Sequence, residues 1–393
     1  MADIRVLHVI PGLGAGGGAE RSLLATASLL RSKGVDLHIV VTGDRQALVP
    51  EFERMGTPVH DISRAGFRRQ ATRLRAIVSA VDPHLVHASL FEAEALVELG
   101  LGFPRRSVPL LITWTGTPFE RDAAQSRATL ASAKRALLRD ARGTLTRWSG
   151  AHVQAVTQGV ADANSAALRI PASRVHVVER GRPPHAASPT LREATRQALG
   201  ITDAESVALL IARHEPEKAI DVAIEAMAAI AQRRPELRLL VAGRAGTTTT
   251  HITQQVAAAG LDDRVILLGH RDDVSSLIDA ADLLVSSSRS EGAAGAIQEA
   301  LAASLPVVAT RTTGSSGMLE DRESAILADP DDPRDLAAAI ELVLGDQNLA
   351  MRIATGGRAL FEQRFTVERS ATALLTLYRE LAAAQATGHR RTH

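Results

Sequence analysis

The sequence predicts an α/β fold with two successive domains, each a doubly wound parallel sheet with helices on both faces. Three observations support this prediction. Short apolar runs alternate with helical stretches, a proline-rich break interrupts the alternation near the middle, and charged or glycine-rich loops follow the apolar runs. The chain has 393 residues and 45% apolar content, which is enough for more than one core.

The first domain is expected over residues 1–182. It begins with the apolar strand Ile4–Ile10 and a glycine-rich loop, and a helical pattern starts at Ala19. The other strands expected in this domain are residues 36–41, 84–88, 108–113, 152–156 and 175–178.

The break contains three prolines and continues neither a helix nor a strand, so we place a linker at residues 183–190. A second domain is expected over residues 191–366. Its predicted strands are residues 207–212, 238–242, 264–268, 283–286, 306–309 and 325–327. A last helix, residues 367–384, has no strand after it and is expected to cross back to the first domain, with a loose tail at residues 385–393.

The composition restricts the compartment and the class of partner. The chain has no cysteine, which excludes disulfides and thiolate metal sites and fits a reducing compartment. The sequence shows no signal-peptide pattern and no run approaching the ~18 apolar residues of a membrane span, so a cytoplasmic protein is expected. Residues 1–185 carry 24 Lys and Arg against 16 Asp and Glu, whereas the remainder carries 21 against 28, so the halves differ in sign.

Two carboxylates define the stretch around which we expect a binding site. Glu291 follows an apolar strand and Glu299 lies eight residues later, or ~12 Å along a helix that starts just past Glu291. Gly292, Ala293 and Gly295 leave the N-terminus of that helix bare for an anion. Carboxylates flanking an anion site suit a sugar nucleotide, although an amphipathic helix with two solvated glutamates fits the same spacing.

Basic residues follow two other strands of the second domain. Arg213 and Lys218, five residues apart, are expected to hold one phosphate group, the arginine by a bidentate fork and the lysine as a point charge. A solvated loop, paired with its own glutamates, is the alternative. Gly243 and Arg244 also follow a strand, and the carboxyl ends of parallel strands share one edge, so we expect these residues to line the same site.

The glycine-rich loop formally matches the dinucleotide fingerprint, with glycines at Gly12, Gly14 and Gly17. This match would indicate NAD or FAD in a dehydrogenase. The acid expected ~20 residues further on is poorly placed, because Asp36 begins the second strand and Asp44 comes late. A dehydrogenase is therefore the weaker interpretation.

The combined pattern resembles the retaining GT-B glycosyltransferases of family 4. The resemblance rests on Arg213, Pro216–Lys218, Glu291–Gly292, Glu299, residues 305–310, Asp329–Pro330, and, in the first half, Gly17, Gly18 and residues 19–21. It implies two Rossmann-like domains that face a central cleft. It also implies transfer of a sugar from a nucleotide-diphosphate-sugar donor to an acceptor, with retention of anomeric configuration.

The resemblance assigns a part of the donor to each matching residue. Arg213 and Lys218 would hold the diphosphate, Glu291 the transferred sugar and Glu299 the ribose, while the glycine loop would approach the phosphates and the acceptor. No metal and no other cofactor is expected, because these cations and a helix N-terminus compensate the diphosphate charge.

The chain departs from the family at Trp114, where family members usually carry a histidine after the strand. A tryptophan cannot exchange a proton but can form an apolar wall for a sugar ring. His87, at the end of another strand, is a candidate for the acceptor or sugar pocket, and a packed or solvated histidine is the alternative. His84 and His87 point to different faces of one strand, so we expect no metal site there.

Two arginine-rich stretches, residues 64–75 and 121–147, are amphipathic or strongly basic, and Phe67 and Leu74 supply apolar candidates. They suit either peripheral binding to the anionic inner face of a membrane or a solvated helix face. Nucleic acid binding is not expected, because aromatic residues are not interleaved with the bases.

The acceptor is expected against the basic first domain and belongs to one of three classes: a sugar, a lipid-linked or polysaccharide precursor, or a small molecule. Two alternative functions stay open. A non-catalytic sugar-nucleotide-binding homologue is suggested by Trp114, and a GT-B epimerase or hydrolase would release product without an acceptor.

Overall fold

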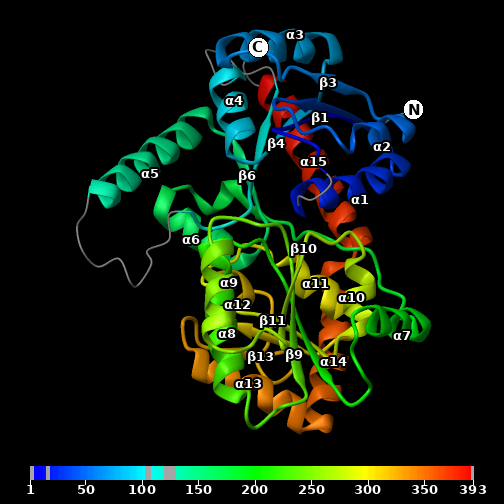
Figure 1. Cartoon of the computed structure of the whole chain (residues 1–393). Helices are drawn as coiled ribbons and strands as arrows, with labels where there is room; N and C mark the ends of the chain where they lie inside the picture. Colours follow the sequence, from blue (N-terminus) through cyan, green and yellow to red (C-terminus); the bar gives the residue numbers. More distant parts are fainter. Residues whose placement is uncertain (1–3, 15–17, 102–107, 119–129, 391–393) are drawn as a thin grey trace. The chain divides into compact units, whose positions relative to one another are not determined.

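Alternating strands and helices build two compact units in the computed structural model, which describes residues 4–14, 18–101, 108–118 and 130–390 (Figure 1). The first unit comprises residues 1–181 together with residues 367–393. The second unit comprises residues 182–366.

The first unit contains a seven-stranded parallel sheet in the order β3-β2-β1-β4-β5-β6-β7. Its strands are β1 (Ile4–Ile10), β2 (Val35–Val41), β3 (Val59–Asp61), β4 (Leu85–Ser89), β5 (Leu110–Trp114), β6 (His152–Ala155) and β7 (Val175–Val177). Its helices are α1 (Gly18–Ser32), α2 (Val49–Arg54), α3 (Phe67–Val81), α4 (Phe91–Leu101), α5 (Leu130–Ser149), α6 (Gln158–Leu168), the 3₁₀ turn Ala172–Arg174 and α15 (Val367–Arg390). Of the strands in this sheet, only β3 was not predicted from the sequence, because it is a three-residue edge strand with one apolar side chain.

The second unit contains a six-stranded parallel sheet in the order β10-β9-β8-β11-β12-β13. Its strands are β8 (Ser206–Ile211), β9 (Leu237–Ala242), β10 (Val265–Gly269), β11 (Leu283–Ser286), β12 (Val307–Thr310) and β13 (Ile326–Ala328). The helices are α7 (Pro189–Ala198), α8 (Ile220–Ile230), α9 (Thr249–Ala258), α10 (Val274–Ala280), α11 (Gly295–Ala302), α12 (Thr313–Ser316), α13 (Pro333–Gly345) and α14 (Gln347–Leu360), with the short helical turns Pro216–Lys218 and Phe361–Phe365.

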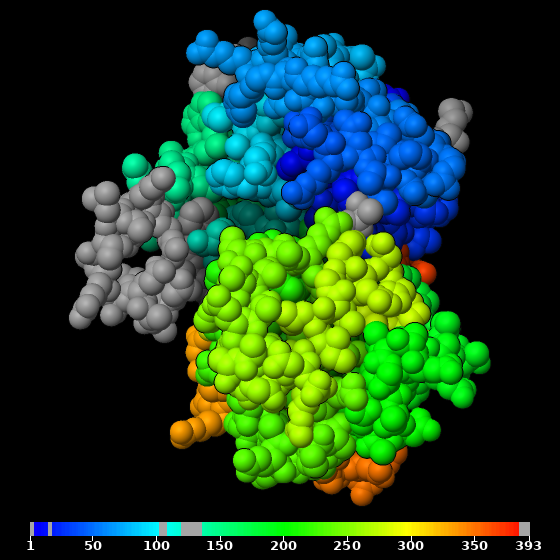
Figure 2. Space-filling view, in the orientation of Figure 1, coloured from blue at the N-terminus to red at the C-terminus, as the bar shows by residue number. Residues whose placement is uncertain are grey.

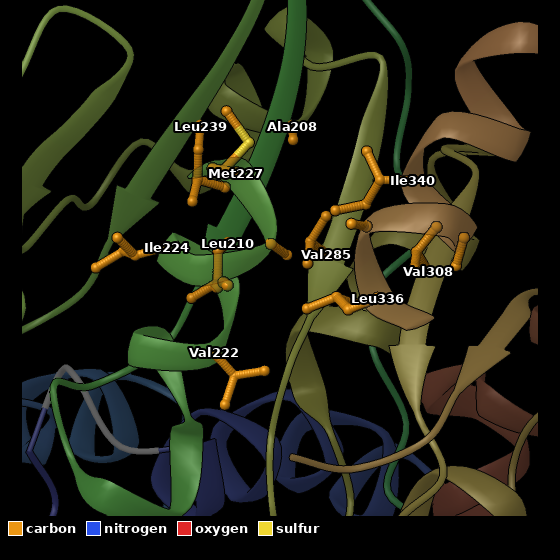
Figure 3. Packing of buried hydrophobic residues seen from close by; sticks show 14 of the residues in the cluster. Ala208, Leu210, Val222, Ile224, Met227, Leu239, Val285, Val308, Leu336 and Ile340 are labelled. Carbon is orange, nitrogen blue, oxygen red and sulfur yellow. The ribbon is translucent and has the colours of Figure 1, made fainter. Parts of the chain in front are cut away.

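The central strands of the second sheet, β8 and β11, are largely apolar, as expected for a sheet that helices cover on both faces. Leu210 of β8, Val285 of β11 and Val308 of β12 lie side by side across the sheet. They share one core with Met227 of α8 and Ile340 of α13 (Figure 3). This apolar packing holds the strand ends, and the loops that follow them, in fixed positions.

The C-terminal helix α15 belongs to the first unit (Figure 1). Ala371, Leu374 and Tyr378 are buried there in one core with side chains of β1, β2 and α1. The helix continues to Arg390, where the sequence predicted a loose tail from Gln385. Residues 391–393 of that predicted tail lie outside the described part of the chain.

Both sheets reverse their strand order once, between β1 and β4 in the first unit and between β8 and β11 in the second. Ligands of open parallel sheets bind at the carboxyl ends of the strands at such a reversal. A ligand-binding site is therefore expected at the loops after β8 and β11.

Candidate functional site

The loops after β8 and β11 meet at the strand reversal of the second unit through a half-buried ion pair. Lys218 ends the 3₁₀ turn that follows β8, and its Nζ lies 2.7 Å from Oε1 of Glu291, which follows β11. Ser288 Oγ donates to the same oxygen at 2.7 Å. The structure thus brings together two residues that the sequence placed on separate loops.

Arg289 ties these two loops together. Its backbone N–H donates to the carbonyl of Glu217 at 2.8 Å, and its guanidinium donates to Pro216 O at 2.7 Å and to both carboxylate oxygens of Asp221. The guanidinium also contacts Asp331. Hydrogen bonds to Asp221 raise the pKa of Arg289. The sequence gives no signal for Arg289, since its partners Pro216, Glu217 and Asp221 lie about 70 residues away along the chain.

A cavity of about 130 Å³ lies next to the ion pair. Lys218, Ser287 and Glu291 line it together with the small residues 293–296 at the start of α11. The N-cap residue, Ala294, has no side chain that caps the helix, so free backbone N–H groups begin beside the cavity. A lysine and a helix N-terminus on the walls of one small cavity suit an anion.

Helix α11 begins at Gly295, three residues later than the start just past Glu291 that the sequence predicted. The expected spacing of ~12 Å along a helix between Glu291 and Glu299 is therefore wrong. Residues before it form an extended loop that packs on α12. A Cβ on Gly314 would lie 2.4 Å from the carbonyl oxygen of Glu291 and 2.6 Å from that of Gly292, so only glycine permits this contact.

Glu299 lies on α11 and forms an ion pair with Arg182, whose Nε is 3.4 Å from Oε1. The Arg182 side chain is 9% exposed, and its Nη2 would lie 2.3 Å from a Cβ on Gly295. A guanidinium therefore lies beside the N-terminus of α11, and because it has no acceptor it leaves the N–H groups of the helix uncapped. This second base adds to the positive potential at the helix start. From the sequence, Arg182 is expected at the end of the first domain and has no predicted role in the site.

Arg213 lies in a solvated loop and pairs with the glutamates of that loop, as the alternative interpretation predicted. Its side chain is 59% exposed and pairs with Glu215 at 3.6 Å and with Glu217 at 3.3 Å. Exposed pairs of this kind contribute ~0–1 kcal/mol, so the guanidinium is held only weakly in this position. It does not line the 130 Å³ cavity.

Gly243 and Arg244 follow β9 and do not line that cavity. A Cβ on Gly243 would lie 1.7 Å from the carbonyl oxygen of Ala212, so glycine is required for close approach of the β8 and β9 loops. The Arg244 side chain is exposed, and its Nη2 lies 3.5 Å from Nε2 of His270. Gly243 thus shapes the loop after β8.

The glycine-rich loop of the first unit is described only in part. Gly17 lies outside the described residues, and Gly18 is the exposed first residue of α1. Gly12 packs against Arg45, where a Cβ would lie 2.9 Å from that residue's Cβ. A tight contact with the loop after β2 therefore explains the first glycine of the formal dinucleotide motif.

Trp114 is the last residue of β5 and is 5% exposed. It lines a cavity of about 340 Å³ in the first unit, together with Phe91, Arg142 and Asn164. The structure thus places Trp114 on the wall of a cavity.

His87 does not reach that cavity. It lies in the middle of β4, buried, with Nδ1 2.7 Å from Tyr378 Oη and Nε2 2.7 Å from Thr113 Oγ1. Burial, with smaller contributions from the charges of His8 and Arg180, lowers the pKa of His87 well below its usual value. Both ring nitrogens are occupied inside the core, which corrects the prediction that His87 contacts the acceptor or sugar.

Comparison with known families matches both halves of the chain. Residues 192–360 match the family model of glycosyl transferases group 1, and residues 16–185 match the model of Glycosyltransferase Family 4. The chain belongs to glycosyltransferase family 4.

Curated relatives in this family include a D-inositol 3-phosphate glycosyltransferase of Salinispora arenicola, 33% identical over 228 residues, or 54% of this chain and 51% of the relative. An α-D-kanosaminyltransferase of Streptomyces kanamyceticus is 26% identical over 254 residues, covering 60% of this chain and 64% of its own length. The chain thus spans about half to two thirds of the length of these relatives.

Solved structures of similar fold cover nearly the whole chain. The HepE protein of Anabaena, in complex with UDP, has a TM-score of 0.78 at 22% identity and covers 98% of this chain and 100% of its own. A sucrose-phosphate synthase from Thermosynechococcus elongatus has a TM-score of 0.80 at 19% identity, with 97% and 100% covered. With two parallel Rossmann-like sheets, the family 4 chain has the GT-B fold.

One base of the second arginine-rich stretch is buried rather than available at the surface. Arg142 of α5 donates from Nη2 to Glu94 Oε2 at 2.6 Å and from Nη1 to Glu98, and all three side chains are less than a tenth exposed. The prediction that the stretch forms one basic surface is wrong at Arg142. Residues 121–129 of the stretch lie outside the described part of the chain.

Among the described residues of this glycosyltransferase family member, no three His, Cys, Asp or Glu side chains are grouped as metal ligands. Within the same residues, no helix combines the length and apolarity needed to cross a membrane.

Proposed function

We propose that this chain transfers a sugar from a nucleotide-diphosphate-sugar donor to an acceptor hydroxyl group. The observation that carries the proposal is the Lys218–Glu291 pair beside the start of α11, at the strand reversal of the second sheet. Similar structures of Anabaena HepE contain UDP or UDP-glucose, and the curated relatives are named as glycosyltransferases, which supports this class of donor.

Stabilising the leaving diphosphate is the main catalytic contribution in this proposal. The ammonium group of Lys218 and the free N–H groups of α11 meet negative charge as it develops. Arg213 joins them by leaving its weak surface pairs. Glu291 accepts hydrogen bonds from the transferred sugar, and Glu299 accepts them from the ribose in exchange for its pair with Arg182.

Retention follows in this proposal from a front-side displacement. The bond between the anomeric carbon and the diphosphate oxygen breaks, and the acceptor oxygen forms its bond on the same face. The proton of the acceptor hydroxyl passes to the leaving phosphate, since Trp114 has no group that exchanges protons. The side chains and helix N–H groups carry the charge compensation, so the reaction proceeds without a metal ion.

A panel of UDP-, GDP- and ADP-sugars tests the proposal through release of the nucleoside diphosphate, with and without acceptors. With the active donor, Lys218→Ala and Glu291→Gln are each expected to lower kcat at least ~100-fold, because each removes a charged contact at the transition state. Chelation with EDTA is expected to leave the rate unchanged.

Lys33→Ala and Glu323→Gln are matched controls, since both residues are exposed and distant in sequence from the site. They are expected to leave kcat unchanged. Full activity of Lys218→Ala would contradict the site assignment. Release that does not depend on any acceptor would identify a hydrolase, and binding without release would identify a non-catalytic homologue.

We also propose that α3 attaches the first unit peripherally to an anionic membrane on the cytoplasmic side. Arg68, Arg69, Arg73 and Arg75 are exposed on α3, and none of them has an ion pair with another described residue. Phe67 is 47% exposed at the start of this helix. Figure 2 shows α3 at the surface of the first unit, at the top of the view. Each base near an anionic surface contributes ~1 kcal/mol.

Sedimentation with vesicles tests this attachment. The vesicles consist of phosphatidylcholine alone or of phosphatidylcholine with about 30% phosphatidylserine. Replacing Arg68, Arg69 and Arg73 with Gln is expected to weaken binding to the anionic vesicles about 100-fold. The control replaces the exposed Arg322, Arg334 and Arg352 of the second unit with Gln, which changes net charge equally. Equal loss in both triple variants would show a general charge effect and reject α3 as the contact.

A further inference from the structure

The 340 Å³ cavity of the first unit lies at the carboxyl ends of β4 and β5, with α5 and α6 contributing to its walls. Phe91 and Trp114 give it aromatic surface, and leucines add further apolar area. A cavity with aromatic walls accommodates the apolar face of a ring.

Two residues that line the cavity carry polar atoms that lack a hydrogen-bond partner. These atoms are Trp114 Nε1 and Asn164 Oδ1. Both residues are buried, Trp114 with 5% and Asn164 with 2% of its surface exposed. The amide nitrogen of Asn164 donates to Gly116 O at 2.8 Å, which leaves its oxygen as the unpaired group. An unpaired buried donor or acceptor costs ~1–3 kcal/mol. One donor and one acceptor match a hydroxyl group, which both accepts and donates.

The charges around the cavity are compensated. Arg142 is the only base among the described residues that line it, and its guanidinium is bound by Glu94 and Glu98. Burial raises the pKa of Glu94 to about 8. With a glutamate on each of its two terminal nitrogens, the Arg142 guanidinium is already bound on both sides. Exposed Glu92, also in the lining, adds a further negative charge, so an anionic ligand finds no free base here.

We propose that this cavity binds the acceptor, and that the acceptor presents to it a neutral, hydroxyl-bearing ring rather than a phosphate group. Trp114 Nε1 donates to a ring hydroxyl, Asn164 Oδ1 accepts from one, and Phe91 contacts the apolar ring face. This inference rests on the proposed glycosyl transfer, because it names the acceptor of that reaction. The bases of α3 are a separate surface and do not enter the cavity lining.

The two tryptophans allow binding to be measured without the donor. Trp148 is 51% exposed, so Trp148→Phe leaves Trp114 as the single indole reporter. Matched probes are methyl α-glucoside with glucose 6-phosphate, and myo-inositol with D-inositol 3-phosphate. We expect the neutral member of at least one pair to change Trp114 fluorescence saturably, with at least tenfold higher affinity than its phosphorylated counterpart.

Calorimetry on the intact chain then tests the named atoms. Trp114→Phe keeps an aromatic ring and removes the N–H, and Asn164→Leu removes the acceptor; each is expected to weaken binding of the neutral probe about tenfold. Trp148→Phe is the matched control and is expected to bind normally. Equal or tighter binding of the phosphorylated probes, unchanged affinity in both pocket variants, or no response of Trp114 to any neutral probe would overturn the proposal.

Failure of the proposed function is recognised separately. Binding of UDP is measured with the unmodified chain and with Lys218→Ala. This substitution lies in the second unit and is expected to leave the fluorescence of Trp114, in the first unit, unchanged. A chain that binds the neutral probe but releases no nucleoside diphosphate would contradict glycosyl transfer while retaining the binding site.

Discussion

At the residue scale, Lys218 and Glu291 compensate each other's charge. Both side chains are half-buried, so a lysine or glutamate here without a partner would be costly, and the 2.7 Å contact between them offsets part of that cost. In the proposed reaction, the donor diphosphate replaces part of this pairing at Lys218, while Ser288 continues to hold Glu291 in place for the sugar hydroxyls. The pair thus prepares both groups in the absence of a donor.

Gly243 is the residue whose replacement the structure predicts most sharply. Gly243→Ala would place a Cβ 1.7 Å from the Ala212 carbonyl oxygen, so the loop after β8 must move. We expect destabilisation of ~2–4 kcal/mol and weaker UDP binding, since overpacking against backbone forces shifts that side chains cannot absorb. Urea unfolding followed by far-UV circular dichroism, with UDP calorimetry, measures both effects.

Gly66→Ala is the control, because a Cβ there meets nothing within 4 Å and its φ is −67°. Its free energy of unfolding is expected to change by less than ~1 kcal/mol, the cost of alanine at a helix N-cap. Equal stability of the Gly243 and Gly66 variants would show that the loop after β8 adapts without cost.

At the scale of elements, α15 is joined to the sheet of the first unit by a polar contact inside an apolar core. Tyr378 Oη bonds to His87 Nδ1 of β4, and Thr113 of β5 completes the pair at Nε2. Ser89, Thr113 and Gln154 continue these polar contacts across β4, β5 and β6. The helix is therefore fixed in register as well as buried.

Tyr378→Phe is expected to destabilise the first unit by ~1–3 kcal/mol, because it leaves a buried imidazole nitrogen unpaired. Both tryptophans lie in the first unit, so tryptophan fluorescence during urea unfolding reports on this unit. Thr372→Ala, at an exposed position of the same helix, is the control, with an expected change within ~0.5 kcal/mol. Equal midpoints for the two variants would contradict a stabilising role for the hydroxyl.

At the scale of the whole molecule, the two units differ in charge and in their buried ionisable groups. Two adjacent histidines, His8 and His87, are buried in the first unit with ring centroids 4.4 Å apart. Burial, and next the charge of Arg180, lowers the pKa of His8 to about 3. Both rings are neutral in the fold and gain a proton only in the unfolded chain.

The first unit is therefore expected to lose stability on acidification. An unfolded histidine has a pKa near ~6.5, so the stability is fully present above that pH and falls as the pH decreases from there towards about 3. The expected loss is ~1.4 kcal/mol per pH unit for each histidine. Urea midpoints from tryptophan fluorescence between pH 7.5 and 5 measure it.

His8→Gln is expected to reduce this pH dependence, because one of the two protonations is removed. An unchanged midpoint of the native first unit between pH 7.5 and 5 would show that the buried histidines do not govern its acid stability.

The sequence by itself determined the two doubly wound domains, the alternation of strands and helices, and the loops that carry Lys218 and Glu291. These features are local, since buried parallel strands require continuous apolar runs and the carboxyl ends of such strands bring their loops to one edge. The crossing helix at the C-terminus was also visible, because no strand follows it.

Only the tertiary structure decided which partners the polar side chains take. It placed Arg182 beside Glu299, used Arg289 to join two loops, buried Arg142 between two glutamates and enclosed His87 in the core. Each of these outcomes depends on a contact between residues far apart in the chain. The hydrophobic pattern that determines a strand carries no information about which distant charge will lie against it, and that choice is made by packing.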